Sequence, residues 1–320
     1  MIGREQQEAV LRDASFEAME VGETFGPVRL VVDDHMVKWC AFTTDDYLPW
    51  ALTGAESPFG GRVGHAAILV PDLLRLLNTK FDPNTEAGLH QKEEVWFSSP
   101  VHVGEEVELH ASFVDKYTKR GKGYIVTEGE ARSVADGRLL VRKRSTEIAR
   151  VDPNVELGSR SASEPSRKVM GEWPQDRPAA TVVSAETTPG THVLGPAKHV
   201  HQDQMSVFSN VQAFWRNIHT DIEAAQAAGF DSTLAQGLME TMYLSQLGTQ
   251  LFGAAWFTSG WMQTIFVGPV RPNDRLQTRA VVIATEPAKD GGSRVELEAW
   301  IENQAAEKTA VGWLGALALA

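Results

Sequence analysis

Two groups of histidine and carboxylate residues are candidates for proton-transfer chemistry. In the second half of the chain His219 is followed by Asp221, and in the first half Asp45 and Asp46 precede His65. An Asp and a His that lie close together can take a proton from water and deliver one to carbon. These residues therefore predict an acid/base site, provided that the fold brings members of a group together.

Each histidine also stands near a segment that contains glycine and leads into a long apolar run. The N–H groups at the start of a buried helix lack helical acceptors and lie at the positive end of the helix dipole. Such groups can stabilise negative charge that develops on an oxygen. We expect them near Gly237 and Leu238 in the second half, and near Ala66 and Ala67 in the first half.

The elements that must position these residues occur twice in the chain. Residue pairs of the same type recur at one constant separation, 203 − 34 = 169, between the first and the second half. The matched pairs are Gly26 and Gly195, Asp34 and Asp203, Met36 and Met205, Phe97 and Phe266, and Pro100 and Pro269. The sequence therefore predicts two copies of one unit, which we call the first and the second repeat.

The two repeats are separated by a segment that is rich in proline, serine and charged residues. This segment, 152–179, has neither helical nor strand periodicity, and it is typical of a surface linker. We expect an N-terminal domain over 1–151 and a C-terminal domain over 180–320.

Both repeats show the same order of predicted elements. A short helix (33–43 or 203–214) is followed by an apolar helix (63–77 or 234–252), which is apolar nearly all round and so buried. Alternating apolar and polar runs with glycine-rich turns follow, as in an antiparallel meander. These runs cover 94–97, 107–117 and 124–148 in the first repeat, and 263–267, 276–285 and 294–320 in the second.

Composition excludes several classes of protein. The net charge of −12 argues against nucleic-acid binding, and no run is long and apolar enough to cross a membrane. The single cysteine, Cys40, excludes an intrachain disulfide, and no histidine has the partners of a metal site. We expect a cytoplasmic homodimer of these tandem chains with no metal and no organic cofactor.

The second repeat resembles the MaoC-like family of (R)-specific enoyl-CoA hydratases and dehydratases. The similar segments are Asn217-Ile218-His219-Thr220-Asp221 and the helix entry Gly229-Phe230 to Gly237-Leu238. The first repeat is similar at its own helix entry, Ser57 to Ala66. The resemblance implies an α+β fold, a tandem double hot dog in which each long antiparallel sheet wraps around one central helix.

The resemblance also implies an Asp five residues before the catalytic His, and here the chain departs from the family. The residue five before His219 is Phe214, whereas the equivalent first-repeat residue is Asp45. The first-repeat equivalent of His219 is Trp50. Each repeat thus keeps one member of the pair, and symmetry does not require Asp45 and His219 to meet.

Three interpretations follow from this split pair. In the first, His219 is the main acid/base residue, helped by Asp221 or Glu240, although Asp221 could equally cap a helix and His219 could be a structural remnant. In the second, Asp45 or Asp46 pairs with His65, although His65 could be a capping or packing residue. In the third, neither site adds water.

Aromatic residues replace polar family residues around the expected pockets. Trp50, Phe214 and Trp215 are bulky at these positions, and Tyr47 stands beside Asp46. We expect these four residues to contact substrate, and we expect Trp50, Phe214 and Trp215 to favour a bulky or aromatic acyl group.

The leading functional expectation is a hydro-lyase that adds water to, or removes it from, the α,β position of an acyl thioester, with coenzyme A as the carrier. One alternative is a hot-dog thioesterase led by the carboxylate of Asp45. The other is a repurposed scaffold, either a lyase or cyclase on a free substrate or a non-catalytic binding subunit.

Overall fold

The computed structural model describes residues 11–83, 88–151, 169, 178–209, 216–289 and 291–318. The predicted linker therefore lies almost entirely outside the described residues, as do Phe214 and Trp215. The division into two domains stays a prediction.

The first repeat consists of an edge strand, a helical segment, one strand that reaches the junction and a three-stranded meander. Its elements are β1 (Thr24–Val31), α1 (Asp34–Thr44), α2 (Pro49–Leu52), α3 (Val70–Arg75), a 3-10 turn η2 (Leu76–Thr79), β2 (Leu89–Phe97), β3 (Glu106–Lys119), β4 (Lys122–Ser133) and β5 (Leu139–Ala149).

The second repeat follows the same order with a longer central helix. Its elements are β6 (His192–His199), α4 (Gln202–Phe208), α5 (Ile222–Ala227), α6 (Gly237–Phe252), α7 (Ala254–Ser259), β7 (Trp261–Phe266), β8 (Arg275–Pro287), β9 (Ser293–Glu302) and β10 (Lys308–Ala318). The last alternating run of each repeat is a hairpin of two strands rather than one strand.

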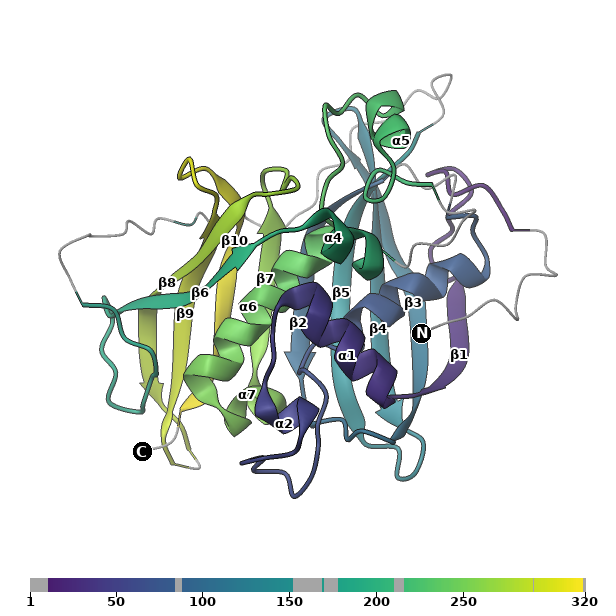
Figure 1. Cartoon of the computed structure of the whole chain (residues 1–320). Helices are drawn as coiled ribbons and strands as arrows, with labels where there is room; N and C mark the ends of the chain where they lie inside the picture. Colours follow the sequence, from purple (N-terminus) through teal and green to yellow (C-terminus); the bar gives the residue numbers. More distant parts are fainter. Residues whose placement is uncertain are drawn as a thin grey trace.

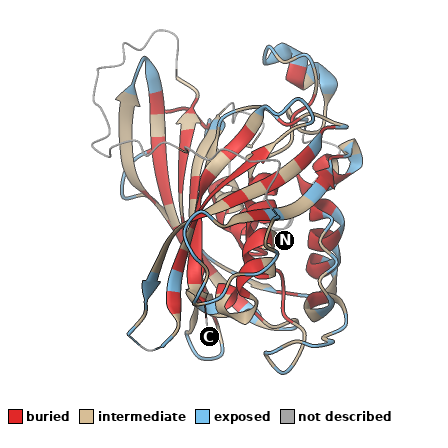
Figure 2. Cartoon of the chain, turned by 90° about the vertical axis from the view of Figure 1, so that its left-hand side faces the viewer, coloured by how far each residue is buried: buried red, intermediate tan, exposed pale blue. Residues whose placement is uncertain are grey.

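All these strands form one antiparallel sheet in the order β1-β3-β4-β5-β2-β7-β10-β9-β8-β6. The long helices α1 and α6 lie across the same face of this sheet (Figure 1). Buried residues are concentrated where the helices and the strands meet, and exposed residues lie at strand ends and loops (Figure 2). The arrangement confirms the predicted α+β double hot dog.

The two halves of the sheet join edge to edge through β2 and β7, on a pseudo-twofold axis. In the pairing of β2 with β7, Glu94 lies opposite Gln263, its own repeat equivalent 169 residues later. The Gln263 Nε2 donates a hydrogen bond of 3.0 Å to Glu94 Oε1. Equivalent residues of two related units touch only on the axis that relates them, so the axis passes through this pair.

A second contact marks the same axis in the helical layer. The Trp39 ring on α1 stacks on Phe208 of α4, its repeat equivalent, with the ring centroids 5.2 Å apart. The Trp39 Nε1 also donates a hydrogen bond of 3.0 Å to the Val207 carbonyl. The two repeats are therefore held together by both layers.

The predicted helix over 63–77 is wrong in its first half. Val63 forms an isolated antiparallel bridge with His102, and the Gly64 N–H donates to the Val101 carbonyl. The helix α3 begins only at Val70, with Pro71 in its first turn, where the missing N–H of proline costs no helical hydrogen bond. Pairing with the strand-like segment near Val101 thus overrides the apolar pattern.

The helix predicted over 234–252 is confirmed from Gly237 onward. The residues before it are extended, because the Leu234 N–H donates to the Ile218 carbonyl and the Ala235 N–H to the Val270 carbonyl. The first short helices are also found, although α4 ends at Phe208. Its predicted continuation lies partly outside the described residues.

We expect Trp39→Ala to destabilise the whole chain, because it removes a buried ring from the contact between the repeats. Loss of a large core side chain typically lowers the free energy of unfolding by about 3 to 5 kcal/mol. Phe42→Ala, on the same helix but with the side chain 42% exposed, is the matched control and should change it by less than about 1 kcal/mol. Urea denaturation followed by tryptophan fluorescence and circular dichroism compares them, and equal effects would contradict this account of the contact.

Candidate functional site

His219 is held by its backbone and by one ring nitrogen in the loop before α5. Its Nδ1 lies 2.8 Å from the Leu234 carbonyl, which can only accept, so Nδ1 carries the hydrogen and Nε2 keeps a lone pair. The side chain is partly buried. Burial lowers the pKa of His219 to about 4, against the opposing effect of the Leu234 hydrogen bond. The ring is therefore neutral at pH 7 and fixed in the tautomer of a base.

The start of α6 follows Leu234 by three residues. Gly237 and Leu238 are the first two residues of this helix, whose N-cap, Gln236, makes no side-chain capping hydrogen bond. First-turn N–H groups have no acceptor within their helix. A Cβ on Gly237 would lie 2.9 Å from the Phe266 ring, so only glycine allows the helix start to pack against that ring.

The contacts of Asp221 stabilise the local structure, and none of those among the described residues is with His219. Its carboxylate accepts a hydrogen bond of 3.0 Å from the Ala224 N–H as the N-cap of α5. It also forms an ion pair of 2.6 Å with Arg216. The Ala224 N–H and then Arg216 hold the pKa of Asp221 below its ordinary value. The capping role considered for Asp221 is the one that its contacts support.

Glu240 lies in the first turn of α6 and is 3% exposed. Burial raises the pKa of Glu240 to about 8, and Asp274 raises it further, while a hydrogen bond with Thr309 opposes the shift. The side chain is therefore protonated at neutral pH. A neutral carboxylic acid at this position can donate a proton but cannot act as a base.

In the first repeat, Asp45 and Tyr47 are both exposed. Asp45 ends α1 in the left-handed conformation, with φ of 50°, and its carbonyl accepts a hydrogen bond of 2.7 Å from Lys198 Nζ. Tyr47 is 57% exposed. Among the described residues, neither side chain contacts another predicted site residue. The catalytic role of Asp45 and the substrate-binding role of Tyr47 therefore stay predictions.

Asp46 lies beside His65. The second interpretation required that either Asp45 or Asp46 should do so. The Asp46 Oδ2 lies 3.6 Å from His65 Nε2, which makes no hydrogen bond within the described residues. The His65 Nδ1 accepts a hydrogen bond of 3.1 Å from the Ala67 N–H. That N–H is thus already occupied, and His65 is only 5% exposed.

Burial lowers the pKa of His65, although the Asp46 carboxylate opposes the shift. Lys198 adds positive charge beside the same ring. These contacts favour a neutral histidine packed between the two repeats over one that meets a substrate.

Trp50 lies in α2 and is part of an aromatic cluster with Phe59 and Phe257. The ring centroids are 5.9 Å apart for Trp50 and Phe257, and 5.3 Å apart for Phe59 and Phe257. Each ring therefore fills space beside the others, and the first repeat is closed with apolar material near the position that equals His219.

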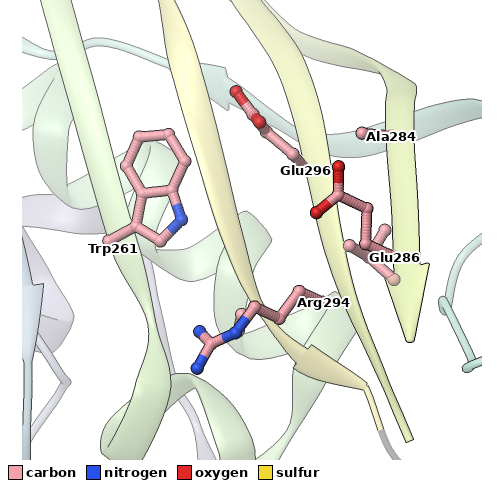
Figure 3. A pocket seen from close by; sticks show the side chains of 7 residues that line it. Trp261, Ala284, Glu286, Arg294 and Glu296 are labelled. Carbon is pink, nitrogen blue, oxygen red and sulfur yellow. The ribbon is translucent and has the colours of Figure 1, made fainter. Parts of the chain in front are cut away.

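A surface hollow lies elsewhere, over β7, β8, β9 and β10 (Figure 3). Trp261 and Glu296 line it, and they alternate with the core residues Met262 and Leu297. Their side chains therefore lie on the face of the sheet opposite to the helices. No predicted site residue lines this hollow.

The sequence interpretation missed a buried charged group on β2 and β5. Glu93 and Lys143 are both 0% exposed. The signal was in the strand pattern, because Glu93 alternates with Val95 and Phe97, which face the core. A charge at an inward position of a strand should have marked Glu93 as a candidate.

Comparison with known proteins places the chain among double hot-dog proteins. Residues 184–302 match the family model described as "MaoC like domain". None of the curated proteins compared with the chain matches it in sequence.

Solved structures match almost the whole chain in fold at low sequence identity. A "MaoC-like dehydratase" is 13% identical with a TM-score of 0.70, and the match covers 96% of this chain and 100% of that one. A "putative MaoC domain protein dehydratase" from Chloroflexus aurantiacus is 9% identical with a TM-score of 0.70, covering 96% and 97%.

A conserved hypothetical protein from Mycobacterium tuberculosis, described as having a double hotdog fold, is 16% identical with a TM-score of 0.63, covering 95% and 98%. At these identities the likeness concerns the fold. The chain is thus a double hot-dog protein whose second repeat is similar to the MaoC-like domain over residues 184–302.

Proposed function

We propose that this protein is a hydro-lyase that adds water to, or removes it from, the α,β position of an acyl thioester of coenzyme A. The observation that carries the proposal is the hydrogen bond from His219 to the Leu234 carbonyl, beside the start of α6. It leaves a neutral Nε2 next to a helix whose first N–H groups can bind an oxygen. The MaoC-like domain in the second repeat supports the reaction class.

In this proposal the His219 Nε2 takes one proton from a water molecule while the water oxygen forms a bond to the β-carbon. The electron pair of the double bond moves toward the thioester, and the enolate oxygen accepts hydrogen bonds from the N–H groups of Gly237 and Leu238. A proton is then added to the α-carbon, which completes the hydration. Dehydration follows the same steps in reverse.

The finer features remain predictions. The prediction of a bulky or aromatic acyl group is based on Trp50, whose ring is partly buried beside Phe59 and Phe257. A homodimer and a cytoplasmic location rest on the fold class and the composition. No described helix is long and apolar enough to cross a membrane.

His219→Ala should lower kcat by about 100-fold or more, the usual effect of removing a positioned acid/base group. Asp45→Asn is the companion variant, and it should leave kcat near the parent value because the Asp45 side chain is exposed. The assay follows hydration of crotonyl-CoA and of aromatic enoyl-CoA esters by loss of the conjugated thioester absorbance. Melting temperatures check that both variants fold.

A different pattern would redirect the assignment. Loss of activity in Asp45→Asn with a tolerated His219→Ala would move the reaction to the first repeat, and release of free coenzyme A would make it thioester hydrolysis. If the parent chain turns over none of these thioesters, the proposed function is wrong and the likeness stops at the fold.

The pH dependence provides a second test of His219. Because its pKa is lowered from 6.5 to about 4, kcat/KM should stay level as the pH falls from 7 to about 5 and decline only below that. A solvent-exposed histidine base would lose activity near its ordinary pKa of about 6.5.

The same shift should affect stability. The unfolded chain binds this proton near its ordinary pKa and the folded chain only near pH 4. The stabilising contribution is thus fully present above pH 6.5 and is lost as the pH falls toward 4. The His219→Gln variant should lose less stability than the parent between pH 7 and 5 in urea denaturation, and parallel curves for the two proteins would contradict the assignment.

A further inference from the structure

A charged network lies on the inner face of the first repeat, next to the junction with the second. The Glu93 Oε2 is 2.9 Å from His90 Nε2 and accepts a hydrogen bond of 2.7 Å from Ser145 Oγ. The Glu93 Oε1 is 3.3 Å from Lys143 Nζ. Although burial opposes it, Lys143, His90 and Ser145 hold the pKa of Glu93 below its ordinary value. The carboxylate is therefore ionised inside the protein.

A bulge in β2 places His90 in this network. The pairing of β2 with β5 shifts register between His90 and Lys92, which leaves Gln91 without a partner on β5. Without the extra residue, side chains three positions apart would point to opposite faces of the sheet. The bulge turns His90 to the same face as Glu93, and bulges commonly re-aim side chains beside active sites.

The fold itself does not require these polar residues. The repeat equivalents of Glu93, Lys143 and Ser145, 169 residues later, are Met262, Gly312 and Leu314. Met262 lies opposite Leu314 on β7 and β10, just as Glu93 lies opposite Ser145 on β2 and β5. The second repeat builds the same sheet with apolar residues, and a buried ion pair usually contributes less stability than such residues do.

The network lies beside the start of α6 in the other repeat. The His90 ring centroid is 5.0 Å from that of Phe266, in an edge-to-face contact. The Phe266 ring in turn packs against Gly237, where a Cβ would be only 2.9 Å away. One aromatic ring thus separates His90 from the helix start that follows His219 and Leu234.

We propose that His90, oriented by Glu93, contacts the bound acyl thioester and is the second acid/base residue of the site at the start of α6. It takes the role of the carboxylate that the family sequence has where this chain has Phe214. This inference rests on the proposed function. The His90 Nε2 has the Glu93 carboxylate as its partner, whereas the His219 Nδ1 has the Leu234 carbonyl, so the two histidines are held differently and can have different roles.

In hydration, the His219 Nε2 accepts a proton from water as the water oxygen bonds to the β-carbon. The His90 ring gives a proton to the α-carbon as the enolate collapses to the thioester. The ring regains a proton from the protonated His219 through solvent, so protons and charge balance over the cycle.

His90→Gln tests the proposal, with His110→Gln as a matched control. His110 makes the same type of contact, with its Nε2 2.9 Å from Glu108 Oε1, but on an exposed part of β3. We expect His90→Gln to lower kcat by about 100-fold with a smaller change in KM, and His110→Gln to leave both near the parent values. Full activity of His90→Gln, together with an inactive His219→Ala, would overturn this inference and leave the proposed function standing.

A binding measurement separates the two proposals and does not depend on turnover. In the full chain labelled with 15N-histidine, saturated butyryl-CoA should shift the ring signals of His90 and His219 but not those of His110. The signals are assigned by their loss in the single variants. If the parent turns over no thioester but butyryl-CoA still shifts His90, the contact is supported and the hydration is not. An unshifted His90 beside a shifted His219 overturns the contact itself.

The same spectra test the orienting role of Glu93. Glu93→Gln should change the tautomer or protonation pattern of the His90 ring while leaving that of His110 unchanged. An unchanged His90 pattern would show that Glu93 does not position it. Circular dichroism verifies that the variant, which leaves Lys143 without its ion pair, is still folded.

Discussion

The antiparallel pairing of β2 with β7 is the contact on which the rest of the molecule depends. It joins two sheets at edges that would otherwise expose unpaired backbone groups, and leaves β1 and β6 as the two outer strands. Because Glu94 lies opposite Gln263, the junction sits on the pseudo-twofold axis and fixes how the helices of both repeats are placed. It also brings the beginning of β2 next to the end of β7, and so sets His90 of one repeat beside Phe266 and α6 of the other.

The two repeats share a backbone plan but have diverged in chemistry. In the second, α6 runs for 16 residues from Gly237, and His219 stands nearby with a free lone pair on Nε2. In the first, the central helix is short, and the Ala67 N–H is taken up by His65. The aromatic cluster of Trp50, Phe59 and Phe257 packs α2 and the following loop of the first repeat against α7 of the second. The two repeats thus share one sheet but differ at the start of their central helices.

Burial acts on the ionisable groups of this interior in two different ways. His219 has no charged partner among the causes of its shift, so desolvation keeps it neutral. Glu93 is more deeply buried, yet Lys143 and His90 keep it charged. A neutral histidine and an ionised carboxylate can therefore coexist in the interior of this protein.

The sequence by itself determined the repeat, the antiparallel strands and the buried helix from Gly237, because these depend on periodic patterns and on a constant separation between similar residues. Its choice of His219 as the main acid/base residue, and the split of the family pair, stay predictions. Only the tertiary structure decided that Asp46 rather than Asp45 lies beside His65. It also decided that Val63 and Gly64 pair with the segment at Val101 and that residues 66–69 form a turn, instead of beginning a helix. It alone placed His90 with Glu93, since a bulge is a property of how two strands pair, and no local pattern in one strand encodes its partner.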